Sequence, residues 1–401
     1  MEVYGYWLVD EHDIDLGRVS LTGVHAFLSE NMFELAAAEA EQLQQSHPDL
    51  AAQVEVVRPS DPSSTSQNAT LASLRVPSAQ GAIIQQKAAS LWPYKLVASV
   101  LERLISAFPA PRFNLQTNTP VISLSRAEAS PGWILTTPRG SITARQVLLA
   151  TNGYTSHLLP AFSDLIVPVR GQIGALLPPG TAQRSATTPP PTKLAHSYVF
   201  AADPPDAASL APRDDYLVQR PLNSGGEMIY GGGRRLARGL GVGEWHDDGT
   251  EPEVAAYLRR NLVPPLDLRS DPDRVAVRQV GEEMEASFEW TGVMGYSRDR
   301  HAWVGAVPES LGGGGAEGGL WICAGYTGHG MPAAALSARE VVRRMVGGDD
   351  VVVGEGKGRL PREFLVSEER VVEARGLPHL TLTQGWEATN YITLMGGEKG
   401  P

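Results

Sequence analysis

Residues 321 to 345, WICAGYTGHGMPAAALSAREVVRRM, place a histidine in a glycine-rich turn between an expected strand and an expected helix. Pro332 suits a first helical position and glycines follow Met345, so the pattern predicts a helix over about residues 332 to 346. The first turn of a helix has unpaired N–H groups and the positive end of the helix dipole. This turn is therefore suited to hold an electron-rich group. An ordinary strand-to-helix junction with a surface histidine is the alternative.

The candidate catalytic residue in this turn is His329, because an unperturbed imidazole titrates near neutral pH. A histidine that only orders the turn is the alternative. Arg220 and Arg234 could receive a substrate carboxylate, although arginines on an exposed sheet face are more often simply solvated. The single cysteine, Cys323, excludes an internal disulfide and any cysteine-rich metal site. We expect no metal centre.

A second glycine-rich stretch, GGGAEG at residues 313 to 318, matches the dinucleotide-binding pattern G-x-G-x-x-G. That pattern indicates dinucleotide binding only when it stands between a strand and a helix. Here a loop precedes it and the expected strand LWICAG follows it. We therefore interpret GGGAEG as a turn and not as a phosphate site.

Composition limits the class of partner. The chain has 401 residues, 42% of them hydrophobic, which is enough apolar material for two or three domains. A net charge of -11 argues against nucleic acid or an anionic membrane as the main partner, because both attract clustered Lys and Arg. No run approaches the roughly 20 apolar residues of a membrane span. These features favour a cytoplasmic protein with a small-molecule partner. The oligomeric state is not indicated.

The elements that must position the turn follow from periodicity. Apolar residues at helical spacing predict helices over residues 30 to 46, 91 to 108 and 251 to 262. The segment FNLQTNTPVISLSR (113 to 126) is expected to be a strand, and GWILTT with SITARQVLLAT is expected to be a hairpin. Its second arm runs into the apolar stretch Val147 to Ala150, which is typical of a central strand. ATNGYT would then emerge at the carboxyl end of that strand, where open α/β sheets bind ligands. The strands TNTPV, VLLAT and WICAG are expected to lie side by side in one sheet.

Six blocks of sequence together resemble the FAD-dependent oxidoreductases related to D-amino acid oxidase, sarcosine oxidase and glycine oxidase, and within them the group similar to gamma-glutamylputrescine oxidases. The similarity runs from about residue 10 to residue 370. The blocks are SLWPYKLV (90 to 97), LQTNTPV (115 to 121), TPRGSITARQVLLATNGYT (137 to 155), PVRGQ (168 to 172), WTGVMGYSRDRHAWVG (290 to 305) and AGYTGHGMP (324 to 332).

The resemblance implies a role for each matching block in binding FAD and a small-molecule amine. Val121 would contact the adenine side of FAD, the ATNGYT strand end would lie beside the dinucleotide, and Arg170 of PVRGQ would lie near the flavin. GHGMP would face the pyrimidine edge of the ring, where a helix N-terminus stabilises the charge of the reduced flavin. Gly292 stands at the position of a flavin-linked cysteine, so any FAD is expected to be non-covalent. The implied cofactor residues are Val121, Thr151, Asn152, Arg170, Gly295, Thr327, Gly328, His329, Gly330 and Met331.

The fold that the resemblance implies is α/β of the D-amino acid oxidase type. An incomplete, discontinuous FAD-binding domain would comprise about residues 75 to 175 and 286 to 346. A substrate domain with a mainly antiparallel sheet would comprise residues 1 to 74 and 176 to 285, and residues 347 to 401 would form an irregular tail. The implied reaction is oxidation of an amine or amino acid to an imine, with oxygen as acceptor.

One family feature has no counterpart in this sequence. Relatives carry an N-terminal βαβ unit with a glycine-rich turn for the pyrophosphate, followed by a flavin-binding loop. Residues 1 to 60 contain neither, so the sequence resembles a member that lacks its front. Such a chain would be either a truncated version of a working enzyme or an inactive remnant or binding module unable to hold FAD. Without the phosphate anchor, we expect a colourless and poorly soluble protein.

Overall fold

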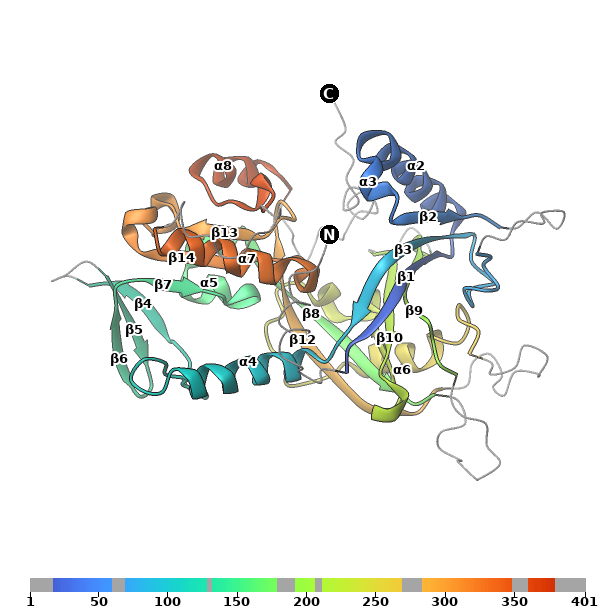
Figure 1. Cartoon of the computed structure of the whole chain (residues 1–401), viewed down its shortest axis with the longest axis horizontal. Coiled ribbons are helices and arrows are strands. Elements are labelled where there is room, and N and C mark those ends of the chain that lie inside the picture. Colours follow the sequence, from blue (N-terminus) through green and yellow to red (C-terminus); the bar gives the residue numbers. More distant parts are fainter. Residues whose placement is uncertain are drawn as a thin grey trace.

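A large sheet forms the right half of the molecule in Figure 1, and a second lobe with two smaller sheets forms the left half. This computed structural model describes residues 17–59, 69–127, 132–178, 192–205, 211–268, 283–347 and 360–378. The expected N-terminal strand pair is described only in its second part, because residues 1 to 16 lie outside these ranges.

The large sheet has eight strands within the described residues, in the order β12-β8-β11-β10-β9-β1-β3-β2. All neighbouring strands run antiparallel except β1 and β9, which are parallel. The strands are β1 (Val19–Phe27), β2 (Val54–Val57), β3 (Gly81–Ser90), β8 (Ile166–Leu176), β9 (His196–Ala202), β10 (Arg213–Gln219), β11 (Met228–Gly232) and β12 (Ala286–Ser297).

One face of this sheet, which we call the covered face, packs against helix α6 (Pro252–Asn261) and forms the main core. Side chains alternate between the two faces of a strand, so every second residue points into this core. Its centre is fully buried. The strand residues at its centre are Val24, Tyr198, Leu217, Tyr230 and Leu176.

The opposite face, which we call the open face, is only partly buried. Strand register aligns one row of side chains across it, because directly paired residues point to the same face. Helix α2 (Glu30–Ser46) covers one end of this face through Phe27 and Ile83. Beyond α2, most of the row stays half-buried or exposed, and Tyr216 is 45% exposed. The row is Ile83, His25, Val199, Tyr216, Gly231, Ile173 and Trp290.

The second lobe contains two three-stranded sheets, with strand orders β13-β14-β7 and β4-β5-β6 in the described chain. Strand β7 runs parallel to β14, and α7 packs against β13 and β14. The strands are β4 (Ser123–Arg126), β5 (Trp133–Thr137), β6 (Gly140–Ala144), β7 (Val147–Leu149), β13 (Trp303–Ala306) and β14 (Leu320–Ala324). The helices not yet given are α3 (Pro48–Ala51), α4 (Pro93–Ala107), α5 (Thr155–Leu158), α7 (Gly330–Met345) and α8 (Glu368–Gly376).

Helix α4 differs from the other long helices because none of its residues is buried. It extends from the β4-β5-β6 sheet toward the large sheet in Figure 1. Its expected apolar stripe forms, yet Val97 is 57% and Ile105 is 49% exposed. The described residues therefore leave the apolar side of this helix uncovered.

The structure bears out some expected elements. The expected helix 30 to 46 is α2 with the same bounds, and residues 251 to 262 contain α6. The strands VLLAT and WICAG lie side by side as β7 and β14.

Two expectations about the second lobe were wrong. TNTPV (117 to 121) does not join the β7-β14 sheet, because the chain turns at Asn118, whose φ is +52°, and the strand there begins only at Ser123. The hairpin arm also ends at Ala144, and Val147 starts a new strand by donating its N–H to the carbonyl of Gly319. Local alternation predicted strands here but could not identify their partners.

The expected domain limits differ from the sheet boundaries. Strands β3, β8 and β12, largely assigned to the FAD-binding domain by the sequence, belong to the large sheet. Helix α8 lies in the segment expected to be irregular. The Ser367 hydroxyl caps it by accepting from the N–H of Arg370, and the Arg370 guanidinium donates to Asp299 over 2.7 Å. Residues 348–359 and 379–401 of that tail lie outside the described ranges.

Candidate functional site

The turn before α7 is fixed in place by its own backbone and by β12. The N–H of Thr327 donates to the carbonyl of Gly295 (2.8 Å), and the Thr327 hydroxyl accepts from the N–H of Ser297 (3.1 Å). Thr327 and Gly328 have φ values of +52° and +79°, so the chain reverses sharply there. His329 is the residue immediately before α7 and is exposed. The helix start therefore presents an accessible imidazole from a rigid turn.

The tautomer of His329 follows from its contact. Its Nδ1 lies 2.9 Å from the carbonyl oxygen of Thr327. A carbonyl only accepts, so Nδ1 carries the hydrogen and, in the neutral ring, Nε2 keeps its lone pair. His329 therefore orders the turn through Nδ1 and offers a hydrogen-bond acceptor at Nε2. A role in ordering the turn and a role toward a ligand, which the sequence gave as alternatives, are thus compatible.

The end of β7 meets this turn directly. The side-chain oxygen of Asn152 accepts from the N–H of Gly325 (3.0 Å) and more weakly from that of Tyr326 (3.4 Å). A Cβ at Gly295 would lie 2.6 Å from that same oxygen, so only glycine fits there. The structure therefore brings Asn152, Gly295 and Thr327 together, though largely through contacts with one another. Thr151 is linked to Asn152 through Thr155, whose hydroxyl lies 2.9 Å from that of Thr151 and 2.8 Å from the carbonyl oxygen of Asn152.

The remaining expected residues of the helix start are exposed. Gly330 and Met331 form the first turn of α7, and the Met331 side chain is 63% exposed. Val121 is half-buried and precedes β4, which belongs to the other small sheet. The structure therefore does not bring Val121 into this cluster.

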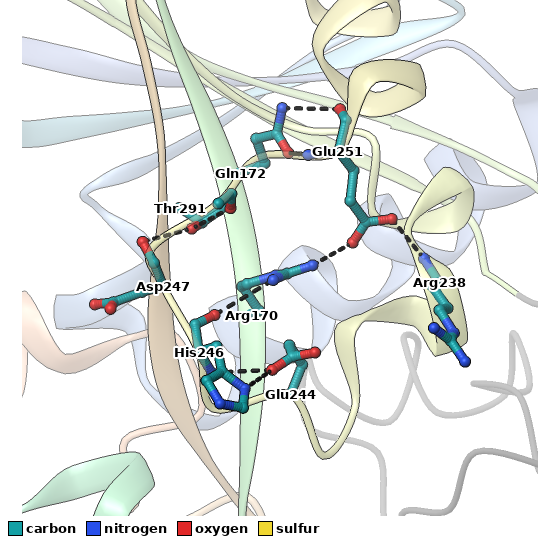
Figure 2. Close-up of polar contacts among 9 residues, drawn as sticks. Arg170, Gln172, Arg238, Glu244, His246, Asp247, Glu251 and Thr291 are labelled. Atoms are coloured by element: carbon teal, nitrogen blue, oxygen red, sulfur yellow. Dashed lines mark hydrogen bonds and ion pairs between the residues drawn. The ribbon is translucent and has the colours of Figure 1, made fainter.

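Arg170 is the expected residue whose surroundings differ most from expectation. Figure 2 shows its guanidinium pointing to Glu251, with Nη2 2.5 Å from the carboxylate, and to the carbonyl of His246 (3.3 Å). Arg170 alternates with the open-face residues of β8 and shares its side of the strand with Gln172. The structure therefore gives this arginine an ion-pair partner away from the His329 turn, and its role as a flavin contact stays a prediction.

Gln172 and Thr291 complete the attachment that Arg170 begins. The Gln172 amide pairs with both backbone groups of Glu251, and the Thr291 hydroxyl lies within 3.0 Å of the carbonyls of Asp247 and Gly249 (Figure 2). Residues 238 to 251, which we call the strapped loop, are thus fastened onto β8 and β12. In this structure the PVRGQ motif acts as a clamp for that loop.

Sequence patterns missed the side chains of the open face that lie near the turn. A Cβ at Gly328 would lie 3.4 Å from the Tyr296 hydroxyl and 3.6 Å from the sulfur of Met294. Both residues point to the open face, because their β8 partners are Val167 and Val169. Alternation along β12 was visible in the sequence. Which of its two faces stays uncovered was not.

Tyr216 and His25 extend this polar group along the same face. Burial of the hydroxyl, with the charges of Tyr296 and Asp214, raises the pKa of Tyr216 to about 12. Burial also lowers the pKa of His25, and the charge of His329 lowers it further. The Tyr216 ring is nevertheless 45% exposed. That combination suits a ligand-facing surface.

The two arginines considered for a substrate carboxylate are already paired. Arg234, which is buried, donates to Asp214 (2.7 Å) and to the Tyr296 hydroxyl (3.1 Å). Arg220 donates to Glu227 (2.8 Å) and lies over the ring of Trp92. Neither arginine is simply solvated, although the sequence analysis had favoured solvation for both. Arg234 instead fixes Tyr296 at the edge of the open face.

Comparison with known proteins gives the family of the chain. A family model for FAD dependent oxidoreductases matches residues 1–344. The chain belongs to this family. No curated protein matches it. FAD-dependent oxidoreductases of this family adopt the α/β architecture with a large, mainly antiparallel sheet that is seen here.

Three solved structures illustrate the likeness of fold. Glycine oxidase from Geobacillus kaustophilus is 17% identical with a TM-score of 0.59, over 86% of this chain and 76% of that one. Iminodiacetate oxidase from Chelativorans sp. BNC1 is 15% identical with a TM-score of 0.56, over 85% and 76%. Fructosamine oxidase from Aspergillus fumigatus is 12% identical with a TM-score of 0.54, over 96% and 78%.

The described residues fit the flavin ring of FAD better than its pyrophosphate. The α7 start offers unpaired N–H groups at an exposed helix end beside Gly328, which suits the electron-rich edge of a flavin ring. Among the described elements, no strand leads through a glycine-rich turn into a long helix apart from β14 and α7. A second such turn for the pyrophosphate is therefore not present in this part of the chain. The GGGAEG turn does not supply it, because the N–H groups of Gly313, Gly315 and Gly318 already donate to backbone carbonyls.

Two other classes of site find no support in the described residues. No group of three or more His, Cys, Asp or Glu side chains there could hold a metal ion. None of the helices described is both long and apolar enough to cross a membrane.

Proposed function

We propose that this chain is an amine or amino acid oxidoreductase in which the open face and the His329 turn together hold the substrate against FAD. The product would be an imine, and oxygen would be the final electron acceptor. The observation that carries the proposal is the convergence of the α7 start, Met294 and Tyr296 on the open face of the large sheet. Family membership supports the cofactor class, and the relatives named above support a nitrogen-containing substrate.

Bound FAD would supply the chemistry of accepting a hydride from the carbon next to the amine nitrogen. The residues of this chain would bind and orient the amine. The apolar row of the open face excludes water from one side of the substrate, and the Tyr296 hydroxyl is held in place by Arg234. The Nε2 lone pair of His329 can accept a hydrogen bond at the opposite side. Fixing the amine in this way supplies orientation, which is the main requirement of the reaction.

A second candidate is a catalytically inactive member of the family, or a binding module, that does not hold FAD. The apolar stripe of α4, which the described residues leave uncovered, favours it, because exposed apolar patches often mark interaction surfaces. The described chain also lacks a second glycine-rich turn for the phosphates. This candidate keeps the substrate face and loses the redox step.

Flavin content separates the two candidates. The polypeptide of residues 1 to 401 is purified, reconstituted with FAD and examined for flavin absorbance and for amine-dependent peroxide formation. A yellow protein that forms peroxide would support the oxidoreductase. A colourless protein that still binds amines would support the inactive alternative. A protein that neither binds FAD nor any amine would overturn both.

A further inference from the structure

Helix α4 carries a narrow row of apolar side chains along its length, which we call the exposed stripe. It consists of Tyr94, Val97, Leu101, Ile105 and Phe108. An α-helix turns by about 100° per residue, so all of these positions lie within about 40° of one line along the helix. Tyr94 at one end is 75% exposed and Phe108 at the other is 41% exposed. The row is therefore a continuous apolar surface.

The order of side chains in the exposed stripe is the same from either end. Its members are three, four, four and three positions apart, so Leu101 is the centre. Both end residues, Tyr94 and Phe108, are aromatic, and the residues next to them, Val97 and Ile105, are β-branched. Reversing the direction of the helix therefore exchanges each side chain with one of like kind.

The rest of the described chain does not bury this surface. None of the residues of α4 is buried, and the helix lies along the lower edge of the molecule in Figure 1. The N–H of Phe108 donates to the carbonyl of Leu104 over 2.9 Å, so the helical spacing continues to the end of the stripe. The charged residues Glu102 and Arg103 are about 100° or more away from the line through Leu101. They suit the polar rim of an interface.

A second copy of this chain matches the symmetry of the stripe. In a two-fold pair each copy presents the same patch, so residue i contacts residue j of the other copy and j contacts i. Two antiparallel α4 helices centred on Leu101 would place Tyr94 against Phe108 of the other copy. Val97 would then face Ile105, and Leu101 would face its own counterpart. Aromatic pairs contribute beyond the area that they bury.

The exposed area sets the strength of such a pair. Because a large aromatic side chain contributes about 150–250 Å², the exposed parts of the stripe amount to roughly 500 Å² on each copy. The two copies together would bury about 1,000 Å², which is the lower limit for a specific interface. We therefore expect a reversible pair with a Kd in the micromolar range.

We propose that two copies of this chain associate through antiparallel α4 helices, with Leu101 at the two-fold axis. The pair uses the exposed stripe of both copies, so association stops at the dimer. This inference does not depend on the proposed function.

Sedimentation velocity of the full 401-residue chain tests the pair. The wild type should pass from monomer to dimer between about 1 and 100 µM. Ile105→Glu should raise the Kd by about tenfold or more, because pairing would bury its carboxylate against apolar side chains. Val372→Glu is the matched control, since Val372 is an apolar residue of α8 that is 72% exposed. It should dimerise as the wild type does, and circular dichroism of each variant checks the fold.

Cysteine cross-linking tests the direction and register of the helices. The variants are made in Cys323→Ser, which removes the single natural cysteine. Leu101→Cys should oxidise to a disulfide-linked dimer, because a disulfide requires Cα atoms within about 7 Å. Tyr94→Cys alone should stay monomeric, since its two copies would be about 20 Å apart along the helices. A mixture of Tyr94→Cys and Phe108→Cys should cross-link.

Several results would overturn the proposal. A wild type that stays monomeric throughout, or that forms a series of larger aggregates, would exclude a closed pair. Dimers that persist unchanged in Ile105→Glu would place the interface elsewhere. Cross-linking of Tyr94→Cys with itself, and not with Phe108→Cys, would show parallel helices.

The pair can be tested separately from the proposed function. The residues of the open-face row all lie outside α4. A simple amine such as benzylamine should therefore bind Ile105→Glu as tightly as it binds the wild type, as measured by calorimetry. Dimerisation can thus fail while amine binding holds, and the reverse.

Discussion

The two faces of the large sheet are built from the same strands and differ in what covers them. The covered face packs against α6 and ends in a buried network in which the Asp215 carboxylate accepts from Arg213, Tyr230 and Tyr257 at 2.6 to 2.7 Å. On the open face, Tyr216 follows Asp215 in the chain but keeps 45% of its surface exposed. The covered face therefore holds the Asp215 carboxylate in a buried network, whereas Tyr216 on the open face stays accessible to a ligand.

The largest expected effect comes from breaking the network of the covered face. Asp215→Ala leaves the Arg213 charge and two tyrosine hydroxyls without their shared acceptor, and also removes the acceptor of the Gly233 N–H. We expect a loss of about 3–5 kcal/mol in the free energy of unfolding, the usual cost of removing one partner of a buried ion pair. Urea denaturation measures it.

Tyr216→Phe is the matched variant on the open face. It changes the adjacent residue of the same strand and should alter the free energy of unfolding by less than about 0.5 kcal/mol, because Tyr216 is 45% exposed and lies outside the core. A comparable loss in both variants would show that the two faces contribute alike to stability.

A smaller effect is expected from the strapped loop. Arg170→Ala removes the partner of Glu251 on the side of β8 that faces away from the His329 turn. We expect a loss of about 1–3 kcal/mol in the free energy of unfolding, since the pair is charged and largely buried. Benzylamine affinity and any flavin binding should be unchanged. A selective loss of flavin binding would restore Arg170 as a cofactor contact.

The smallest expected effect is the dependence of stability on pH. Burial lowers the pKa values of His25 and His196 in the folded state. The unfolded chain therefore binds more protons than the folded one as pH falls below about 6.5, and stability decreases toward acid. Replacing either histidine by Gln should flatten the slope of unfolding free energy between pH 6.5 and pH 5. An unchanged slope in both variants would contradict the assigned burial.

Sequence predicted the elements better than their partners. The α2 and α6 helices have clear periodicity and were placed correctly, and the cluster around Thr327 and Asn152 was found through matching blocks. The pairing of β7 with β14 was predicted, but the pairing of β4 was not, because strand pairing depends on distant contacts.

The residues of the open face were missed for a different reason. His25, Tyr216 and Met294 lie in strands whose alternation is visible, but alternation does not tell which face another element covers. Arg170 was expected near the flavin through its matching block, and that role stays a prediction. Its ion-pair partner Glu251 is 81 residues away, and no local pattern marks that contact.

The central claim is that amines bind the open face and not the covered one, and methionine methyl groups report on both. Met294 points to the open face, whereas Met228 and Met284 are buried in the core of the covered face. Methyl NMR spectra of methionine-labelled protein are recorded with and without benzylamine. The account predicts a shift of the Met294 signal, with Met228 and Met284 unmoved. A shift at Met228 or Met284 with none at Met294 would contradict it.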